Sequence, residues 1–532
     1  MSKKHFIGGI GPVVQRELRE GARRPVNHRL RFLSAVVGTV LLWIVVAKYE
    51  GATEQLGGYL LGCLHSLVLL LIFVIVPGLT ADCIAREKRE GTLGLLFLTP
   101  LKVGGIVAGK ALVGALRAFT LWLAVLPILI IPFIAGGVTW FDALSAVSLE
   151  FCAMVLCLAA GLFASSLAKE RNTAFFLAYV FGAGFLLFFS QLFIIILAVG
   201  FRGLSYLVIN YQDWRELWIF NNELISMFLG ISFYGRSLGW NELAATPGLS
   251  RMWELLCLTM PLVTLVIFYY VARFAAYRIN RSWQDKVPSA RRESLLRRYC
   301  TPLFQRRFRR KMQRTLDWNP IAWLQQYSWK ARLSKWGLCL GFLLIEAAAQ
   351  NAGEDARDAV HFALLLALGG IYTFAGVSGF LEEKRSGALE LLLVTPISVN
   401  KLIFGRVWGL WKQFLPAGLI LAGFFLSNKS LWSDDWPDAC AVVFIHACLF
   451  FTLPVFATYF ALRVKNLVVA AALTWVALCV PEFTVESACA NFVGDFQMDS
   501  SAIQLIFLSY LAFALLACFL LRHSLSRRIY SF

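Results

Sequence analysis

The sequence has few charged residues and no cysteine pattern typical of a disulfide or zinc framework. Only 15% of its 532 residues are charged, whereas 59% are hydrophobic, and this balance excludes an ordinary water-soluble domain. The 12 cysteines include no CxxC pair, and most of them fall in or beside apolar runs. We therefore expect free cysteines in a membrane protein.

The sequence also lacks the residue patterns of an enzyme. No nucleophile constellation or metal-ligand spacing occurs, and one segment alone resembles a phosphate-binding loop. That segment, GGIVAGKA at 104–111, has Ala111 where a Ser or Thr would hold magnesium, and no buried strand precedes it. We expect no catalytic residues, no metal and no cofactor in this chain.

Long apolar runs are what the sequence does contain. A bilayer core about 30 Å thick needs roughly 20 apolar residues per helix, and twelve runs are candidates, the seventh being short. The expected fold is an all-α polytopic membrane protein with about 12 transmembrane helices. The twelve runs are 32–47, 57–81, 112–135, 143–168, 173–201, 253–276, 336–350, 359–380, 407–426, 439–462, 467–485 and 502–521.

The positive charges predict the orientation. If the N-terminus is cytoplasmic, most of the 50 Lys and Arg fall in inner segments, as the positive-inside rule requires. Both termini are then cytoplasmic, and the net charge of +18 is a topological signature, so no nucleic-acid partner is expected. No secretory signal is expected, because 31 mostly polar and basic residues precede the first run.

An internal repeat divides the chain into two halves. EKREGTLGLLFLTP at 87–100 and EKRSGALELLLVTP at 383–396 share nine of fourteen residues at an offset of 296, and each follows the second run of its half. Pro12 and Pro320 each open an amphipathic stretch, and FASSLAKERN at 163–172 aligns with FATYFALRVKN at 456–466 after a one-residue gap. The halves are therefore parallel repeats.

The apolar runs, the repeat and the distribution of charge together predict five regions. Between Arg273 and Lys335 there are 17 Lys and Arg but only 3 Asp and Glu, which indicates a basic linker for anionic lipid or an acidic partner. The regions are an N-terminal amphipathic segment at 1–31, a first membrane half at 32–276, the cytoplasmic linker at 277–335, a second membrane half at 336–521 and a cytoplasmic tail at 522–532.

The repeated loop and the six-span layout of each half resemble the membrane subunits of ATP-binding-cassette (ABC) transporters, specifically the type-2 exporter permeases. The resemblance implies that two fused six-helix halves form one translocation pathway for a transported substrate in a plasma membrane, here a bacterial inner membrane. It also implies that each repeated loop is a coupling helix on a separate cytoplasmic ATPase, which supplies ATP and magnesium.

The same resemblance names the coupling residues. Charged side chains could pair with a partner's cleft, and glycine permits a tight bend. The two copies differ at Gly94 and Glu390 and at Glu90 and Ser386, so the two sites are not equivalent. The expected coupling residues are Glu87, Lys88, Arg89, Gly91, Thr99, Pro100, Glu383, Lys384, Arg385, Gly387, Thr395 and Pro396.

Five ionisable residues within the apolar runs are candidates for lining the pathway. His65 and His361 match at the offset of 296, and Glu150, Glu346 and Glu482 lie within other runs. Pairing of these glutamates across helices and bonding of the histidines to neighbours are the alternatives. A secondary transporter, a membrane enzyme and a non-transporting membrane scaffold remain open as other functions.

Overall fold

The structure is a computed structural model, and all statements below concern the residues it describes. These are 26–48, 56–97, 103–202, 247–282, 305–350, 354–427, 436–492 and 500–527, apart from positions 137, 139 and 328, together with a few positions between 11 and 19. Every regular element in these ranges is a helix. The expected all-α class is confirmed.

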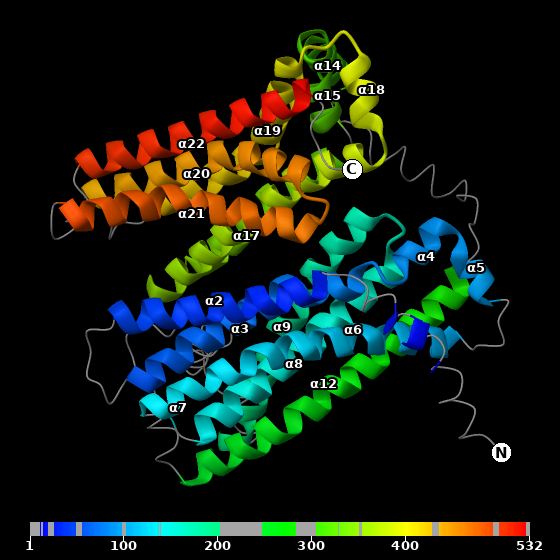
Figure 1. Cartoon of the computed structure of the whole chain (residues 1–532), viewed down its shortest axis with the longest axis vertical. Coiled ribbons are helices and arrows are strands. Elements are labelled where there is room, and N and C mark those ends of the chain that lie inside the picture. Colours follow the sequence, from blue (N-terminus) through cyan, green and yellow to red (C-terminus); the bar gives the residue numbers. More distant parts are fainter. Residues whose placement is uncertain are drawn as a thin grey trace. The chain divides into compact units, whose positions relative to one another are not determined.

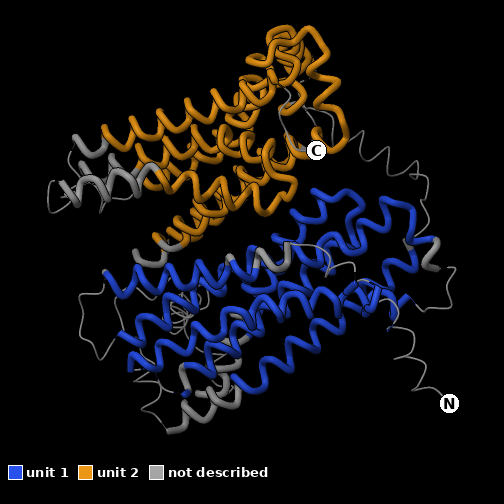
Figure 2. Tube along the Cα trace, viewed as in Figure 1, with its two compact units in different colours: residues 1–287 blue, residues 288–532 orange. Residues whose placement is uncertain are grey.

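The chain divides into two compact units, residues 1–287 and 288–532 (Figure 2). The division falls inside the predicted linker, and the helices at 305–327 belong to unit 2. The helices of unit 1 are α2 (Val26–Lys48), α3 (Leu56–Ala81), α4 (Ala85–Glu90), α5 (Thr92–Phe97), α6 (Val103–Val125), a 3₁₀ turn (Leu126–Ile130), α7 (Ile131–Ala135), α8 (Trp140–Leu167), α9 (Arg171–Arg202) and α12 (Pro247–Ser282).

Unit 2 begins with α14 and α15 and then follows the order of the long helices of unit 1, with α17 alone covering the stretch that forms α3 and α4 in unit 1 (Figure 1). Its helices are α14 (Gln305–Trp318), α15 (Pro320–Tyr327), α16 (Trp329–Ala349), α17 (Glu354–Arg385), α18 (Ala388–Val394), α19 (Val399–Leu426), α20 (Trp436–Arg463), α21 (Leu467–Phe492) and α22 (Ser500–Ser526).

Nine helices in the described part of the chain are long and apolar enough to cross a membrane, and two shorter apolar helices cover Ser34–Ala47 and Leu467–Val480. These eleven coincide with predicted runs, whereas the short seventh run lies in α16, which is not among them. Large apolar side chains also face outward, such as Trp43 and Leu419 at 72% and 62% exposed. The chain is therefore a multi-pass membrane protein, and the total of twelve spans and the side of the termini stay predictions.

Helix α8 forms the centre of unit 1, where it packs against α3, α9 and α12. Small residues permit these close approaches: a Cβ at Gly161 would lie 2.5 Å from the carbonyl oxygen of Pro77 on α3. The buried residues 152–162 and 164–166 of α8 complete this core. In Figure 1 the long helices α3, α6, α8 and α12 run side by side around it.

The offset of 296 extends from the repeated loop to the helix boundaries. Helices α6 and α19 start at Val103 and Val399, and α8 and α20 start at Trp140 and Trp436. Helices α8 and α20 end at Leu167 and Arg463, again 296 positions apart. The gapped alignment of 163–172 with 456–466 is therefore wrong, because the helix ends match without a gap.

Candidate functional site

The repeated loops have the same backbone course in both units. Gly91 and Gly387 have φ angles of 70° and 74°, in the left-handed region that glycine adopts without a steric penalty. Each glycine separates the preceding helix from the short helix α5 or α18. The tight bend expected from the sequence is thus present in both loops.

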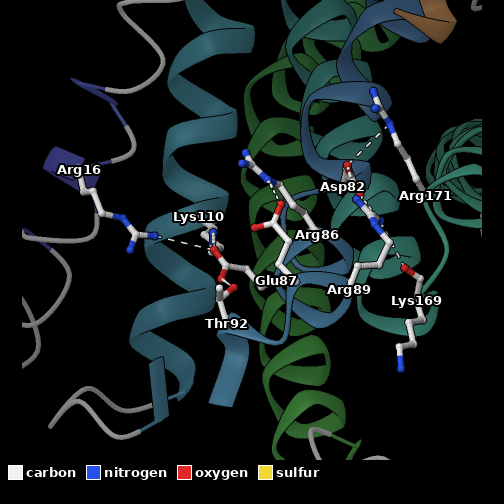
Figure 3. A network of polar contacts seen from close by, with 10 residues as sticks. Arg16, Asp82, Arg86, Glu87, Arg89, Thr92, Lys110, Lys169 and Arg171 are labelled. Carbon is white, nitrogen blue, oxygen red and sulfur yellow. Dashed lines mark hydrogen bonds and ion pairs between the residues drawn. The ribbon is translucent and has the colours of Figure 1, made fainter. Parts of the chain in front are cut away.

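The glutamate of each loop binds a cation on the next long helix. Lys110 Nζ of α6 donates to Glu87 Oε1 over 2.9 Å, Thr92 Oγ1 donates to Glu87 Oε2, and Arg16 lies 3.8 Å away (Figure 3). In unit 2 the guanidinium of Arg406 on α19 donates to Glu383 Oε2. Each pair therefore ties its loop to the helix that follows it.

The lysine of each loop binds the end of the fourth long helix of its unit. Lys88 Nζ donates to the carbonyl oxygen of Ser166 over 2.5 Å, and Lys384 Nζ donates to that of Leu462 over 2.6 Å. The acceptors are 296 positions apart, as are the donors. A helix end has carbonyls without partners in the helix, so each lysine caps one of them.

The arginine of each loop binds a backbone carbonyl in the turn that follows the fourth long helix of its unit. Arg89 Nη1 donates to the carbonyl oxygen of Lys169 over 3.3 Å, and Arg385 donates to that of Lys465. All three charged residues of each copy therefore have equivalent partners in their own unit. The sequence suggested contacts of these side chains with a partner protein, and it did not reveal that they fix the loop to two neighbouring helices.

A sequence signal for one of these contacts did exist. Glu87 and Lys110 are 23 positions apart, as are Glu383 and Arg406, and opposite charges recur in both copies. Repetition of a charge pair at constant spacing predicts a contact. The backbone acceptors leave no comparable trace, because any residue supplies a carbonyl.

The surroundings of the two loops differ. In unit 1, Asp82 accepts two hydrogen bonds from Arg89, of 2.8 and 3.0 Å, and lies 3.8 Å from Arg171 (Figure 3). The residue 296 positions after Asp82 is Ser378, so unit 2 has no carboxylate there. The two loops share their internal contacts but not their surface charge.

Helix α18 presents an apolar outer face. Leu389 is buried against unit 2, while Leu391 and Val394 are 73% and 72% exposed. Thr395 ends the helix, its hydroxyl donating to the carbonyl oxygen of Leu392 over 2.6 Å, and Pro396 follows in an exposed bend. Thr99 and Pro100, the corresponding residues of the first copy, lie outside the described residues.

His65 and His361 each have a carboxylate beside them, which the sequence did not reveal. His65 Nδ1 lies 3.1 Å from Glu150 Oε1 on α8, and Trp122 Nε1 donates to Glu150 Oε2 over 2.7 Å. His361 Nδ1 lies 2.6 Å from Glu346 Oε1 on α16. The histidines are equivalent, but their carboxylates come from different helices.

Glu150 and Glu346 are buried, at 0% and 1% exposed. Each is paired with a histidine on another helix, as one of the alternatives from the sequence expected. The side chain of Glu482 lies outside the described part of the chain. No group of three His, Cys, Asp or Glu residues that could hold a metal ion occurs among the described residues.

No model of a known protein family matches the chain, and no curated protein matches it.

Proposed function

We propose that the chain is the permease subunit of an ABC transporter, an exporter in a bacterial inner membrane, and that a separate ATPase drives it. The proposal is supported most by the two repeated loops, which keep the same glycine bend and the same three internal contacts in both units. Both loops follow the second long helix of their unit.

The contacts suit a loop that transmits force. Each loop is joined to the next long helix through its glutamate and to the end of the fourth long helix through its lysine. A charge-assisted hydrogen bond in a partly buried site resists displacement more than a neutral one does. A push on the short helix would therefore pass to two long helices at once.

The outer face of α18 supplies the contact with the ATPase. Leu391, Val394 and the exposed Glu390 project away from the unit, whereas the charged residues Lys384 and Glu383 face inward. An exposed apolar patch with a polar rim is typical of a protein interface. The partner thus binds the short helix α18, and the charged residues fix the end of α17, which precedes it.

Co-purification tests this assignment. The double variant Leu391→Glu, Val394→Glu is compared with the intact chain after mild detergent extraction, and the associated proteins are identified by mass spectrometry. We expect an ATPase with the intact chain and at least a tenfold loss with the variant, because two carboxylates would have to be desolvated at the interface.

Ser386→Glu is the matched control, because it adds a negative charge to the same loop where the first copy already has Glu90. This control is expected to retain the ATPase. If no ATPase accompanies the intact chain, or if the double variant retains it fully, the proposed coupling is wrong, and a secondary transporter or a membrane scaffold is favoured.

One observation favours the secondary transporter as a second candidate. The pairs His65 with Glu150 and His361 with Glu346 place ionisable groups within helices of a membrane protein, and such groups are typical of proton pathways. Glu150→Gln separates the two functions: it would abolish the dependence of transport on a proton gradient in a secondary transporter, whereas an ATP-driven exporter shows no such dependence.

A further inference from the structure

Two tyrosine–arginine pairs follow one another along the C-terminal half of α12. Arg273 Nη1 donates to the hydroxyl of Tyr269 over 3.3 Å, and Arg281 Nη1 donates to that of Tyr277, also over 3.3 Å. Each arginine follows its tyrosine by one helical turn, and the second pair follows the first by two turns, so all four side chains share one face of the helix. We call these four residues the Tyr–Arg face.

The Tyr–Arg face is directed away from the core of unit 1. All four of its side chains are exposed, and those of Tyr269 and Tyr277 are 55% and 59% exposed. On the opposite side of α12, Ala275 and Ile279 are buried in one apolar cluster with Leu162 of α8. The packing of this buried side determines the direction in which the Tyr–Arg face is presented.

The Tyr–Arg face continues an apolar surface of the same helix. Leu258, Leu262 and Val266 are 68%, 62% and 53% exposed, and they recur every four residues on the side of α12 that carries the Tyr–Arg face. The stretch Cys257–Arg281 is long and apolar enough to cross a membrane. These exposed apolar side chains therefore contact the acyl chains of the bilayer, and the Tyr–Arg face follows at the end of that contact.

The tyrosines place this end of α12 at the level of lipid headgroups. The rings of Tyr269 and Tyr270 have centroids 5.7 Å apart, and Tyr270 is 65% exposed. Tyrosine is enriched where the hydrocarbon core meets the headgroups. Because a helix rises 1.5 Å per residue, Arg273 lies about 10 Å along the axis from Val266. A phospholipid whose acyl chains lie against Val266 would have its phosphate near Arg273.

The arginines of the face are available to an anion. Among the described residues, the tyrosine hydroxyls are the hydrogen-bond partners of Arg273 and Arg281, and no carboxylate forms an ion pair with either. A guanidinium has five N–H donors in a planar fork that matches a phosphate, and each tyrosine accepts one of them. Each hydroxyl therefore orients its arginine and leaves other donors directed to the bilayer surface.

Unit 2 lacks this pattern on its corresponding helix. Helix α22 is the sixth long helix of unit 2, as α12 is of unit 1, but its residues 515–526 contain no tyrosine. His523 follows Phe519 by one turn there, with ring centroids 6.3 Å apart. The Tyr–Arg face is therefore not required by the helix order that the two units share, and this difference favours a separate role for it.

We propose that the Tyr–Arg face binds the phosphate groups of anionic phospholipids in the leaflet at the C-terminal end of α12. The two arginines bind phosphate, the two tyrosine hydroxyls orient the arginines, and the exposed apolar side chains before them contact the acyl chains. Basic residues at the end of a membrane helix attract anionic lipids, and a guanidinium can bind a phosphate through two parallel hydrogen bonds. The site does not depend on the proposed ATPase.

Lipid binding by the full chain tests the site. The purified protein is titrated with phosphatidylglycerol or phosphatidylcholine, and bound lipid is measured by native mass spectrometry. Arg273→Gln, Arg281→Gln is expected to weaken phosphatidylglycerol binding about twenty-five-fold, since each basic residue near an anionic lipid contributes about a fivefold factor. Phosphatidylcholine should bind less tightly to the intact chain and should not respond to the variant. Unchanged phosphatidylglycerol binding, or an equal loss of both lipids, would overturn the site.

The matched control removes the same charge from the same helix. Arg278 is exposed but lies about 140° around α12 from Arg273, because the two are five residues apart. Arg273→Gln alone is expected to weaken phosphatidylglycerol binding about fivefold, and Arg278→Gln less than about twofold. Equal losses would show that the basic helix end attracts lipid diffusely, without a site on this face. Since all these side chains are exposed, each variant should elute as the intact chain does.

The role of the tyrosines is tested by Tyr269→Phe, Tyr277→Phe, which keeps both charges and both rings. This variant should lose phosphatidylglycerol, but less than the double arginine variant does, because the guanidinium groups remain without their orienting contacts. No loss would show that the hydroxyls do not orient the arginines. Inorganic phosphate added in excess should not displace the lipid, since it has no acyl chains; full displacement would show a site for free phosphate and would overturn the proposal.

Discussion

The two units share the construction of their loops but fill the space behind them in opposite ways. In unit 1, Thr80 of α3 lies between Gly114 of α6 and Gly161 of α8, where added Cβ atoms would approach its side chain to 2.5 and 2.1 Å. In unit 2 the equivalent of Thr80 is Gly376, and a Cβ there would lie 2.9 Å from Ala457 and 3.6 Å from Leu410.

This difference is an exchange of volume at fixed backbone positions. The equivalents of Gly114 and Gly161 are Leu410 and Ala457, so the central residue has become smaller as its neighbours have become larger. Interiors tolerate substitutions that conserve total volume better than those that do not. The positions of the helices next to the loop are therefore constrained more tightly than the identities of the residues that fill the space between them.

The largest difference in stability loss between the two units is expected when the glutamate partner of the buried cation, Arg406 or Lys110, is removed. Glu383→Ala leaves the guanidinium of Arg406, which is 1% exposed, with the ring of Phe380 at 4.6 Å as its remaining favourable contact among the described residues. Removing one partner of a buried ion pair costs about 3–5 kcal/mol. Thermal unfolding in detergent, followed by size exclusion, measures this loss.

Glu87→Ala is the matched variant in unit 1, and its effect should be smaller. Lys110 is 7% exposed, and its single flexible ammonium group is more easily hydrated than a buried guanidinium. The double variant Glu383→Ala, Arg406→Met should recover most of the lost stability. An equal loss for the two single glutamate variants would contradict the assigned difference between the units.

The volume exchange is tested by a double-mutant cycle on the contact of Thr80 with Gly114. Gly114→Ala brings a methyl group against Thr80 and should destabilise the protein by about 1–3 kcal/mol. Added to Thr80→Gly, which recreates the small central residue of unit 2, the same substitution should cost much less, with a coupling of about 0.5–3 kcal/mol. Additive effects would show that the two positions do not share one space.

Replacement of the loop glycine by alanine should lower the free energy of unfolding by the same amount in both units. Gly91→Ala and Gly387→Ala each force a side chain into the left-handed region, with no other atom within 4 Å of the new Cβ. Each should therefore cost about 1–2 kcal/mol from the backbone alone. Unfolding curves that differ by more than this between the two variants would show that the bends are not equivalent.

The smallest loss of stability is expected on replacement of Asp82, whose equivalent in unit 2 is Ser378. Asp82→Asn weakens the paired hydrogen bonds to Arg89, whose side chain is 31% exposed. Pairs near the surface contribute about 0.2–1 kcal/mol and are screened by salt. The loss should fall within this range and shrink when the melt is repeated at high salt; a larger loss that does not depend on salt would contradict a surface pair.

The membrane class and the helix positions could be predicted because they follow from apolar run length, and the loop glycines because few other residues adopt a positive φ. The short seventh run is also helical, in α16, which begins at Trp329, but the basic first turns of α16 and Glu346 reduce its apolar length. The partners of Glu150 and Glu346 could not be predicted, because they depend on which helices are neighbours.

The alignment of 163–172 with 456–466 failed for a related reason. Alignment of chemically similar residues favoured a gap. Lys88 and Lys384, however, bind backbone oxygens of Ser166 and Leu462, which have different side chains. Where a backbone oxygen makes the contact, the side chain at that position can change without loss of the contact. The helix ends then preserve the register better than the side chains do.

Site-specific photocrosslinking at Leu391 shows which protein, if any, binds the outer face of α18. A photoreactive residue is placed at Leu391 on α18, with Leu419 on the apolar α19 as the control, and the intact chain is irradiated in its native membrane. We expect a crosslink from position 391 to an ATP-hydrolysing protein and none from position 419. If position 391 captures lipid alone or the same proteins as position 419, α18 does not bind an ATPase and the assignment as a permease subunit is contradicted.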